Sequence, residues 1–367
     1  MNTGRIQHID VWRCIAITMV VASHLVRFLD PWYQQALPGI LSAIRKAGPL
    51  GVQIFFCISG FVICRGMMRE AAASGTVGMR GFYIRRAYRI LPALTAYLAC
   101  IALLNHFGVF NLNFVQFLKV GAFLCNFREF GPSCPWEIGH TWSLAYEEQF
   151  YLIFPLLFVC GRYVRHGGTA LKTVCVLTPL FLLALVWKNS AVTTYLGYML
   201  FMLAGCFFAL YWKKLEPLLT SLPVPGWFAI LLIVLAIGLL PQPSALKRLF
   251  AFVLPILICI VIFGTPIRRA SIKSFFSNQG LAHLGRISYG IYLWQQLATA
   301  NFGFASPFMT ALALSGLTVI LAHYSYRYFE LPLIKKGNVL AAKYSAPKKV
   351  AGESPDYADD VPSKMAA

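Results

Sequence analysis

Ten long apolar runs constrain what this chain can fold into more than any other feature. A membrane-spanning helix needs about 20 mostly apolar residues. Runs of this kind lie at residues 9–29, 47–67, 88–107, 140–160, 170–187, 195–212, 226–240, 249–264, 287–305 and 308–330. Only 12% of the residues are charged, whereas soluble domains carry about 25%. The sequence therefore predicts an all-α polytopic membrane protein with about ten transmembrane helices.

The distribution of Lys and Arg predicts the orientation of these helices. Basic residues favour the cytoplasmic side of a membrane. With a cytoplasmic N-terminus, they concentrate in the predicted inner segments, such as 65–89 and 268–286, and are sparse in the outer ones. We therefore expect a multi-pass protein of the inner (cytoplasmic) membrane with both termini in the cytoplasm. The net charge of +19 is divided among apolar runs and forms no surface stripe, so a nucleic-acid partner is not expected.

Two ionisable residues in the first apolar run are candidates for function, because such groups are costly inside a bilayer. Arg13 and His24 are eleven residues apart, which places them on one helix face about 16 Å from each other. Asp10 precedes Arg13 by three residues and can neutralise it. Histidine titrates near neutral pH and is the natural proton acceptor for a hydroxyl. The alternatives are that Arg13 extends to the inner headgroups and that His24 is a packing residue.

Two adjacent glutamates occupy the apolar run at 140–160. Glu147 and Glu148 would lie about 10–13 Å from its outer end, close to the expected depth of His24. Neighbouring helical residues point in different directions, so at most one of them faces His24. An acid beside an imidazole orients a general base, and we expect one glutamate to do so here. The alternative is a structural ion pair with Arg13 or another cation.

Three arginines crowd the predicted cytoplasmic start of the third span. Arg85, Arg86 and Arg89 lie within five residues of one another, and the guanidinium group suits forked recognition of phosphate. The positive-inside rule alone would explain several of these arginines. Their density favours a phosphorylated cytosolic ligand.

At the other end of the chain, Pro332 is expected to end the last span.

The ten cysteines include no CxxC pair, and no metal site is predicted. Most of them lie in apolar spans, where cysteine is usually a small buried hydrophobe. Cys125 and Cys134 share one outer loop and could form a disulfide if that side of the membrane is oxidising.

Six segments carry a resemblance to a known family. They are IDVWRCIAITMVVASHL, GVQIFFCISGFVI, YIRRAYRILP, TWSLAYEEQFYLIFP, GRISYGIYLWQ and YRYFELP. In this order they resemble the acyltransferase family 3 membrane O-acyltransferases. The resemblance implies a membrane-embedded acyltransferase domain at residues 1–335. Residues 336–367 would then be a cytoplasmic tail, whose polar, Pro-containing composition predicts disorder.

The resemblance also implies an activity. Members of the family transfer an acyl group, usually acetyl, from cytosolic acyl-CoA to a hydroxyl of a carbohydrate such as exopolysaccharide, O-antigen, peptidoglycan or a lipo-chitooligosaccharide. Acetyl-CoA would be the donor substrate, with no permanently bound cofactor, and the partners would be a carbohydrate or glycolipid acceptor and the lipid bilayer. The resemblance implies that Arg13 and His24 are essential. It also implies that Arg85, Arg86 and Arg89 bind the donor and that Glu147 and Glu148 lie in the catalytic cavity.

In the mechanism that the residues and the resemblance share, His24 withdraws the proton from a sugar hydroxyl or briefly takes the acetyl group itself. The candidates for steadying the developing oxyanion are Gln53, Ser143 and Tyr151. One departure from the family is Gln295, where many relatives carry a histidine. The rival interpretations are a saccharide transporter or flippase without acyl transfer, and a sensor that keeps an inactive transferase fold.

Overall fold

A computed structural model describes residues 7–29, 31–127, 131–163, 190–242, 244–300 and 307–344, and this part of the chain is helical throughout, with no strand. The first half comprises α1 (Gln7–Leu25), η1 (Val26–Phe28), α2 (Pro31–Ala36), α3 (Pro38–Ser74), α4 (Met79–His106), α5 (Phe114–Gly121), α6 (Trp136–Gly139) and α7 (Thr141–Tyr163). The second half comprises α9 (Ser190–Leu210), α10 (Trp212–Ser221), α11 (Val224–Leu239), α12 (Ser244–Phe263), α13 (Ala270–Phe276), α14 (Gln279–Arg286), α15 (Ser288–Ala298), α16 (Pro307–Ser325), η2 (Tyr326–Glu330) and α17 (Leu331–Ala342). The predicted all-α class is confirmed.

Several of these helices can cross a membrane. By length and composition, the candidates among the described residues are His8–Phe28, Pro38–Ser74, Met79–His106 and Phe308–Ala342, and α9 with α10 adds a fifth that is bent by 93°. Two shorter apolar helices lie at Val224–Leu239 and Leu249–Phe263. The predicted span at 170–187 lies outside the described residues. The chain is therefore a multi-pass membrane protein.

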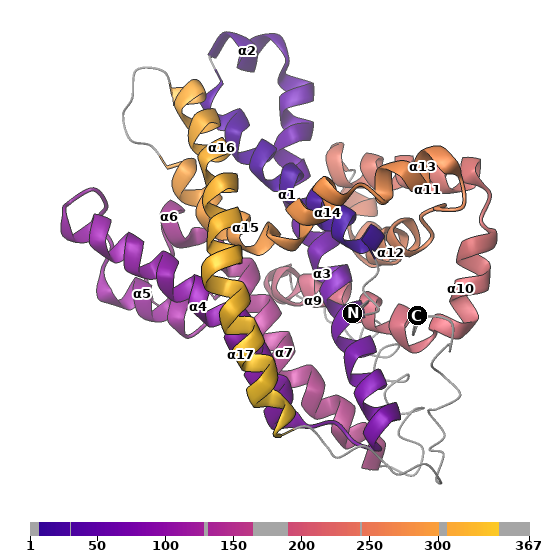
Figure 1. Cartoon of the computed structure of the whole chain (residues 1–367). Coiled ribbons are helices and arrows are strands. Elements are labelled where there is room, and N and C mark those ends of the chain that lie inside the picture. The colour runs from indigo at the N-terminus through magenta and orange to yellow at the C-terminus, as the bar shows by residue number, and fades with distance from the viewer. Residues whose placement is uncertain are drawn as a thin grey trace.

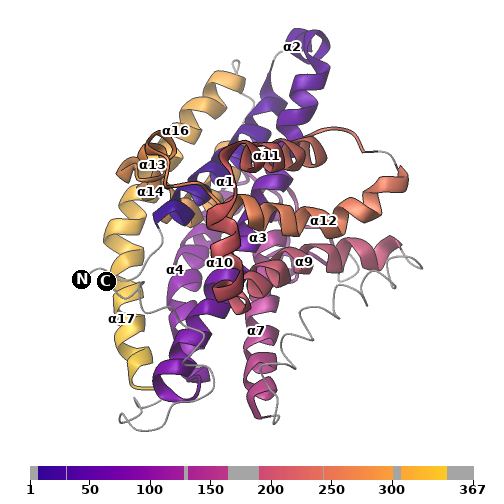
Figure 2. The same ribbon diagram turned by 90° about the vertical axis from the view of Figure 1, so that its right-hand side faces the viewer.

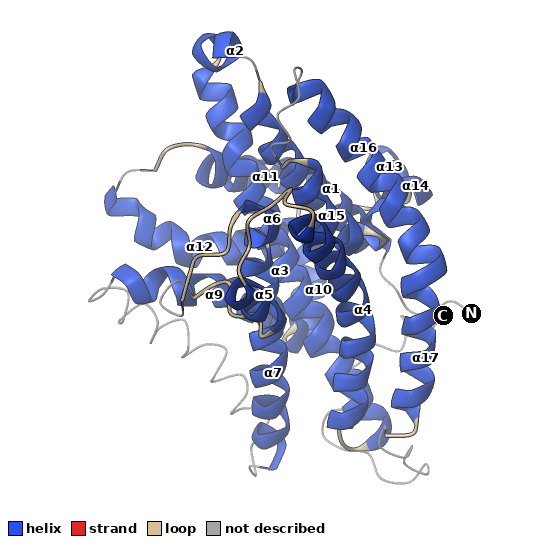
Figure 3. Cartoon of the chain, turned by 90° about the vertical axis from the view of Figure 1, so that its left-hand side faces the viewer, coloured by secondary structure: helices blue, strands red, loops and turns tan. Residues whose placement is uncertain are grey.

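Two pairs of segments lie at opposite ends of the molecule. Figure 1 shows α2 and the start of α16 at one end, and the α3–α4 connection and the end of α17 at the other. The views turned by 90° in Figures 2 and 3 show the same separation. These are the segments that the distribution of basic residues assigns to the outer and the cytoplasmic side, respectively.

Two expectations about the C-terminal half are wrong. The run at 287–305 does not form one spanning helix, because α15 is 11 residues long and Thr299 caps its C-terminus. Its polar end is packed inside the protein instead, with Gln295 and Thr299 fully buried. Pro332 does not end the last span either. It lies in the first turn of α17, directly after a π-helical turn, where a proline needs no backbone N–H donor. The helix therefore continues to Ala342, beyond residue 335.

Glycines allow α1, α3, α9 and α14 to approach one another closely. A Cβ atom added at Gly60 of α3 would lie 1.9 Å from the carbonyl oxygen of Met202 in α9, and one at Gly205 would lie 2.1 Å from that of Cys57. A Cβ atom added at Gly285 of α14 would lie 1.7 Å from the backbone carbonyl oxygen of Asp10 in α1. Small residues at such crossings let backbones touch inside a membrane. These contacts hold α3 against α9 and α14 against α1.

We expect Gly60→Ala to destabilise the protein by about 1–3 kcal/mol, because the added methyl group overpacks the α3–α9 crossing. Gly66→Ala on the same helix is the matched control, since nothing lies within 4 Å of a Cβ atom there. Thermal unfolding of the detergent-solubilised variants checks this. Equal melting temperatures for the two variants would contradict the packing described.

Candidate active site

Two neighbouring cavities hold most of the candidate residues. The inner cavity has a volume of about 100 Å³ and is lined by Arg13, Val52, Phe55, Phe56, Ser59, Arg86, Arg89, Ile90, Ser143, Leu144, Glu147, Tyr151, Ser288, Tyr289 and Tyr292. The outer cavity has a volume of about 360 Å³ and is lined by Val20, His24, Gly48, Pro49, Val52, Cys134, Trp136, Gly139, His140, Trp142, Tyr292 and Gln296. Val52 and Tyr292 line both cavities, so they form the wall between them.

Helix α1 supplies one charged or polar group to each cavity. Arg13 lines the inner cavity and His24 lines the outer one, as expected for two residues that share a helix face about 16 Å apart. Arg13 Nη1 lies 3.3 Å from Asp10 Oδ1, which confirms the predicted ion pair.

His24 is oriented by an amide. Its Nδ1 lies 2.7 Å from Oε1 of Gln295. The Gln295 amide nitrogen donates to Gln296 Oε1 at 3.2 Å, and the Gln296 amide nitrogen donates to the Trp136 carbonyl oxygen at 2.6 Å. Because Gln295 Oε1 can only accept, His24 Nδ1 carries the proton. The lone pair is then on Nε2, which makes that atom the base.

The expectation that Glu147 or Glu148 orients His24 is therefore wrong. Glu147 lies in the inner cavity, where its Oε1 accepts hydrogen bonds from Ser59 Oγ and the Tyr151 hydroxyl. Glu148 Oε1 is buried and has no hydrogen-bond partner among the described residues. The physical reason is the packing of α15 against α1, which brings Gln295 to the position that a carboxylate was expected to take.

The inner cavity is basic, although its arginines are not the three expected. Arg86 and Arg89 of α4 line it together with Arg13, and the Arg86 guanidinium lies 4.5 Å from the ring centroid of Tyr151. Arg85 pairs with Glu70 instead, with Nη2 2.8 Å from Oε2, and does not line either cavity. Of the polar candidates, Ser143 and Tyr151 line the inner cavity. Gln53 lines neither of the two cavities described.

Tyr292 is held in place between the cavities. Its hydroxyl lies 2.5 Å from Ser143 Oγ and donates to the carbonyl oxygen of His140 at 2.8 Å. These bonds connect α15 to the start of α7. The ring of Tyr292 thereby stays in the shared wall.

Sequence reasoning missed His140. Its side chain is only 4% exposed and lines the outer cavity. Neither ring nitrogen has a hydrogen-bond partner in the part of the chain that the structure describes. Its position could have indicated a functional residue, because His140 is an ionisable residue at the start of the apolar run HTWSLAYEEQ.

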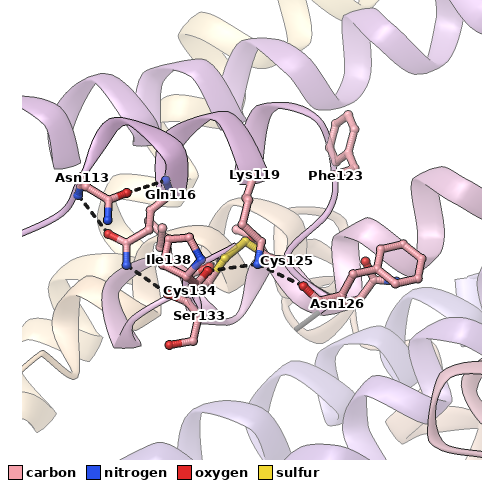
Figure 4. The surroundings of a disulfide bond; sticks show 12 residues. Asn113, Gln116, Lys119, Phe123, Cys125, Asn126, Ser133, Cys134 and Ile138 are labelled. Carbon is pink, nitrogen blue, oxygen red and sulfur yellow. Dashed lines mark hydrogen bonds between the residues drawn. A yellow bond between two sulfur atoms is a disulfide. The ribbon is translucent and has the colours of Figure 1, made fainter. Parts of the chain in front are cut away.

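A cross-linked loop forms one wall of the outer cavity. Figure 4 shows the disulfide between Cys125 and Cys134, whose Cα atoms are 5.9 Å apart. Lys119 of α5 is buried beside it and donates to the carbonyl oxygens of Phe127 and Pro132, each at 3.0 Å. Cys134 itself lines the outer cavity. The pairing that the sequence left open is therefore formed, and it holds the chain just before α6.

Several curated proteins are similar in sequence to this chain. The chain is 28% identical over 370 residues to the peptidoglycan O-acetyltransferase OatA of Listeria monocytogenes, covering 90% of this chain and 56% of the relative. It is 27% identical to the putative peptidoglycan O-acetyltransferase YrhL of Bacillus subtilis, covering 80% and 51%. It is 26% identical to the O-acetyltransferase OatA of Staphylococcus aureus, covering 80% and 53%. This chain thus spans about half the length of the curated relatives it matches. No solved structure matches it.

The family assignment rests on a separate match. The sequence model of an acyltransferase domain matches residues 6–327, which include the residues that line both cavities and five of the six segments that carry the resemblance; the sixth, YRYFELP, begins at residue 326. The chain therefore belongs to acyltransferase family 3.

Proposed function

We propose that this protein is a membrane O-acetyltransferase that moves an acetyl group from cytosolic acetyl-CoA to a hydroxyl of a cell-surface or exported carbohydrate. The observation that carries the proposal is the pair of cavities with a shared wall. One contains three arginines and the other contains an oriented imidazole. Relatives named as peptidoglycan O-acetyltransferases make a glycan the acceptor class to test first.

The inner cavity is the candidate contact region for the donor; its volume of about 100 Å³ admits only part of acetyl-CoA, since small-molecule sites usually have about 300–1,000 Å³. Arg13, Arg86 and Arg89 offer charge-assisted hydrogen bonds to the phosphates of acetyl-CoA, and α4 begins at the predicted cytoplasmic side. The acyl end of the pantetheine arm would then lie against Val52 and Tyr292. This places the thioester at the wall that both cavities share.

The acceptor reacts from the outer cavity. His24 Nε2 takes the proton of the acceptor hydroxyl, and the hydroxyl oxygen attacks the thioester carbonyl carbon. The carbon–sulfur bond breaks, and the proton passes to the departing CoA sulfur. The Ser143 hydroxyl lines the inner cavity beside Tyr292 and, by rotating away from the Tyr292 hydroxyl, can donate to the developing oxyanion. In the second route, Nε2 attacks the thioester carbonyl carbon and CoA leaves as the thiolate; the acceptor hydroxyl oxygen then takes the acetyl group from Nε2, and its proton passes to the CoA sulfur.

The proposed setting is the cytoplasmic membrane, with about ten crossings and both termini in the cytoplasm; the short helix α15 then makes one crossing without a full-length span. Three observations support it: the distribution of Lys and Arg, the sorting of helix ends in Figure 1, and the disulfide in the predicted outer loop. Disulfides persist on the oxidising side of such a membrane.

We expect His24→Ala to lower the rate of acetyl transfer by about 10²–10⁴-fold, because the general base is lost. Gln295→Leu should lower kcat by about 10-fold and leave KM for acetyl-CoA unchanged, since it removes only the group that orients the imidazole. Transfer of labelled acetyl from acetyl-CoA by the purified protein measures both. Wild-type rates in His24→Ala would contradict the mechanism.

The donor site predicts a contrast between two neighbouring arginines. Arg89→Ala should raise KM for acetyl-CoA by about 10-fold or more, since it removes a charge-assisted contact to phosphate. Arg85→Ala is the matched control and should leave this KM unchanged, because Arg85 pairs with Glu70 outside the cavity. Equal effects of the two substitutions would place the donor elsewhere.

The orientation can be tested through the disulfide. In intact spheroplasts, a membrane-impermeant reductant followed by an impermeant maleimide should label Cys125 and Cys134. A Cys125→Ser, Cys134→Ser double variant should lose that label. Labelling only after the membrane is permeabilised would reverse the proposed sides.

A further inference from the structure

We propose that the outer cavity is the acceptor subsite, in which the His140 ring and the indole N–H of Trp136 bind hydroxyl groups of one neutral sugar ring. The inference rests on the proposed function and deepens it. It assigns recognition of the acceptor to two side chains that do not line the donor cavity and whose ring nitrogens have no hydrogen-bond partner among the described residues.

Three buried polar atoms of residues that line this cavity are available to bind a ligand. Both ring nitrogens of His140 and Nε1 of Trp136 are buried without a hydrogen-bond partner among the described residues, and both side chains line the outer cavity. Proteins seldom bury such groups unsatisfied, because each one loses its hydrogen bonds to water. An imidazole with two open nitrogens can donate from one and accept at the other. A hydroxyl group, which also donates and accepts, is its natural partner.

The charge of the cavity indicates a neutral ligand. The residues that line it include no Asp, Glu, Lys or Arg, whereas the inner cavity is lined by three arginines. The phosphates of the donor therefore have a site in one cavity and none in the other. A volume of about 360 Å³ lies at the lower end of the range for small-molecule sites, about 300–1,000 Å³. This space suits one sugar ring of a chain better than a polymer segment.

Aromatic side chains complete the subsite. Trp136, Trp142 and Tyr292 line the cavity and offer apolar ring faces beside polar atoms, the combination that orients an amphipathic ligand. The Trp136 ring is fixed on two sides. The Arg27 guanidinium lies 3.8 Å from its centroid, and the His24 ring stands edge-on with centroids 5.0 Å apart. A sugar held on Trp136 therefore lies next to His24.

His140 differs from His24 in what holds it. The Nδ1 proton of His24 is fixed by Gln295, whereas the position of His140 is fixed through its backbone, whose carbonyl oxygen accepts from the Tyr292 hydroxyl at 2.8 Å. His140 is thus anchored at the shared wall, and its two ring nitrogens have no hydrogen-bond partner in the described part of the chain. Its expected role is to hold the acceptor while His24 removes the proton.

The test uses the cell-envelope glycan fraction from a deletion strain as acceptor and labelled acetyl-CoA as donor, with the purified full-length protein. His140→Ala should raise the KM for the glycan fraction by about 10-fold, with kcat and the KM for acetyl-CoA unchanged. His140→Gln should recover part of the affinity, because its amide also donates and accepts. Trp136→Phe, which keeps a ring but loses the N–H, should raise the same KM. His106→Ala, at the exposed end of α4, is the matched control and should behave as wild type.

The outcomes separate the inference from the function on which it rests. A fall in kcat at unchanged glycan KM in His140→Ala would make His140 a catalytic residue and overturn the proposal. Unchanged glycan KM in both Trp136→Phe and His140→Gln would also overturn it, even if His140→Ala fails to fold. No label transfer by the wild-type protein would refute the proposed function itself.

Discussion

The hydrogen bond between His24 and Gln295 determines what the rest of the site can do. The two residues are far apart in the sequence, and the bond exists because α15 is a short buried helix packed against α1. The amide chain from Gln295 through Gln296 to the Trp136 carbonyl leaves Gln295 Oε1 only one role, that of acceptor. A carboxylate would orient the imidazole equally well but would add a charge to a buried site. The amide fixes the tautomer at no such electrostatic cost.

The two cavities separate two kinds of chemistry by charge. Arginine lines the inner cavity and is absent from the lining of the outer one, so a polyanion and a neutral polyol each have a place that does not suit the other. The same helices supply both cavities. Helix α1 gives Arg13 to one and His24 to the other, and α15 gives Tyr292 to both. Specificity and mechanism therefore depend on a small set of helices, which glycine contacts hold together.

What the sequence predicted was local, and what it missed depended on tertiary packing. The eleven-residue spacing of Arg13 and His24 and the ion pair of Arg13 with Asp10 follow from helix periodicity alone. The partner of His24 could not be predicted, since it is 271 residues away. Arg85 was expected beside Arg86 and Arg89, but it forms an ion pair with Glu70 on another helix and does not line the inner cavity. His140 was overlooked because an unsatisfied side chain becomes visible only once its neighbours are placed. The length of α15 was overestimated because apolar composition cannot distinguish a buried core helix from a membrane span.

Tyr292 has a further consequence for the bilayer. Its ring and Val52 are the common boundary of a cavity on the predicted cytoplasmic side and one on the predicted outer side, and two hydrogen bonds hold its hydroxyl in place. An acetyl group can pass this boundary if one side chain shifts locally. A continuous chain of water molecules would require the Tyr292 ring to move out of the boundary entirely. The separation of the two cavities thus depends, at this point, on one phenol ring and one valine side chain.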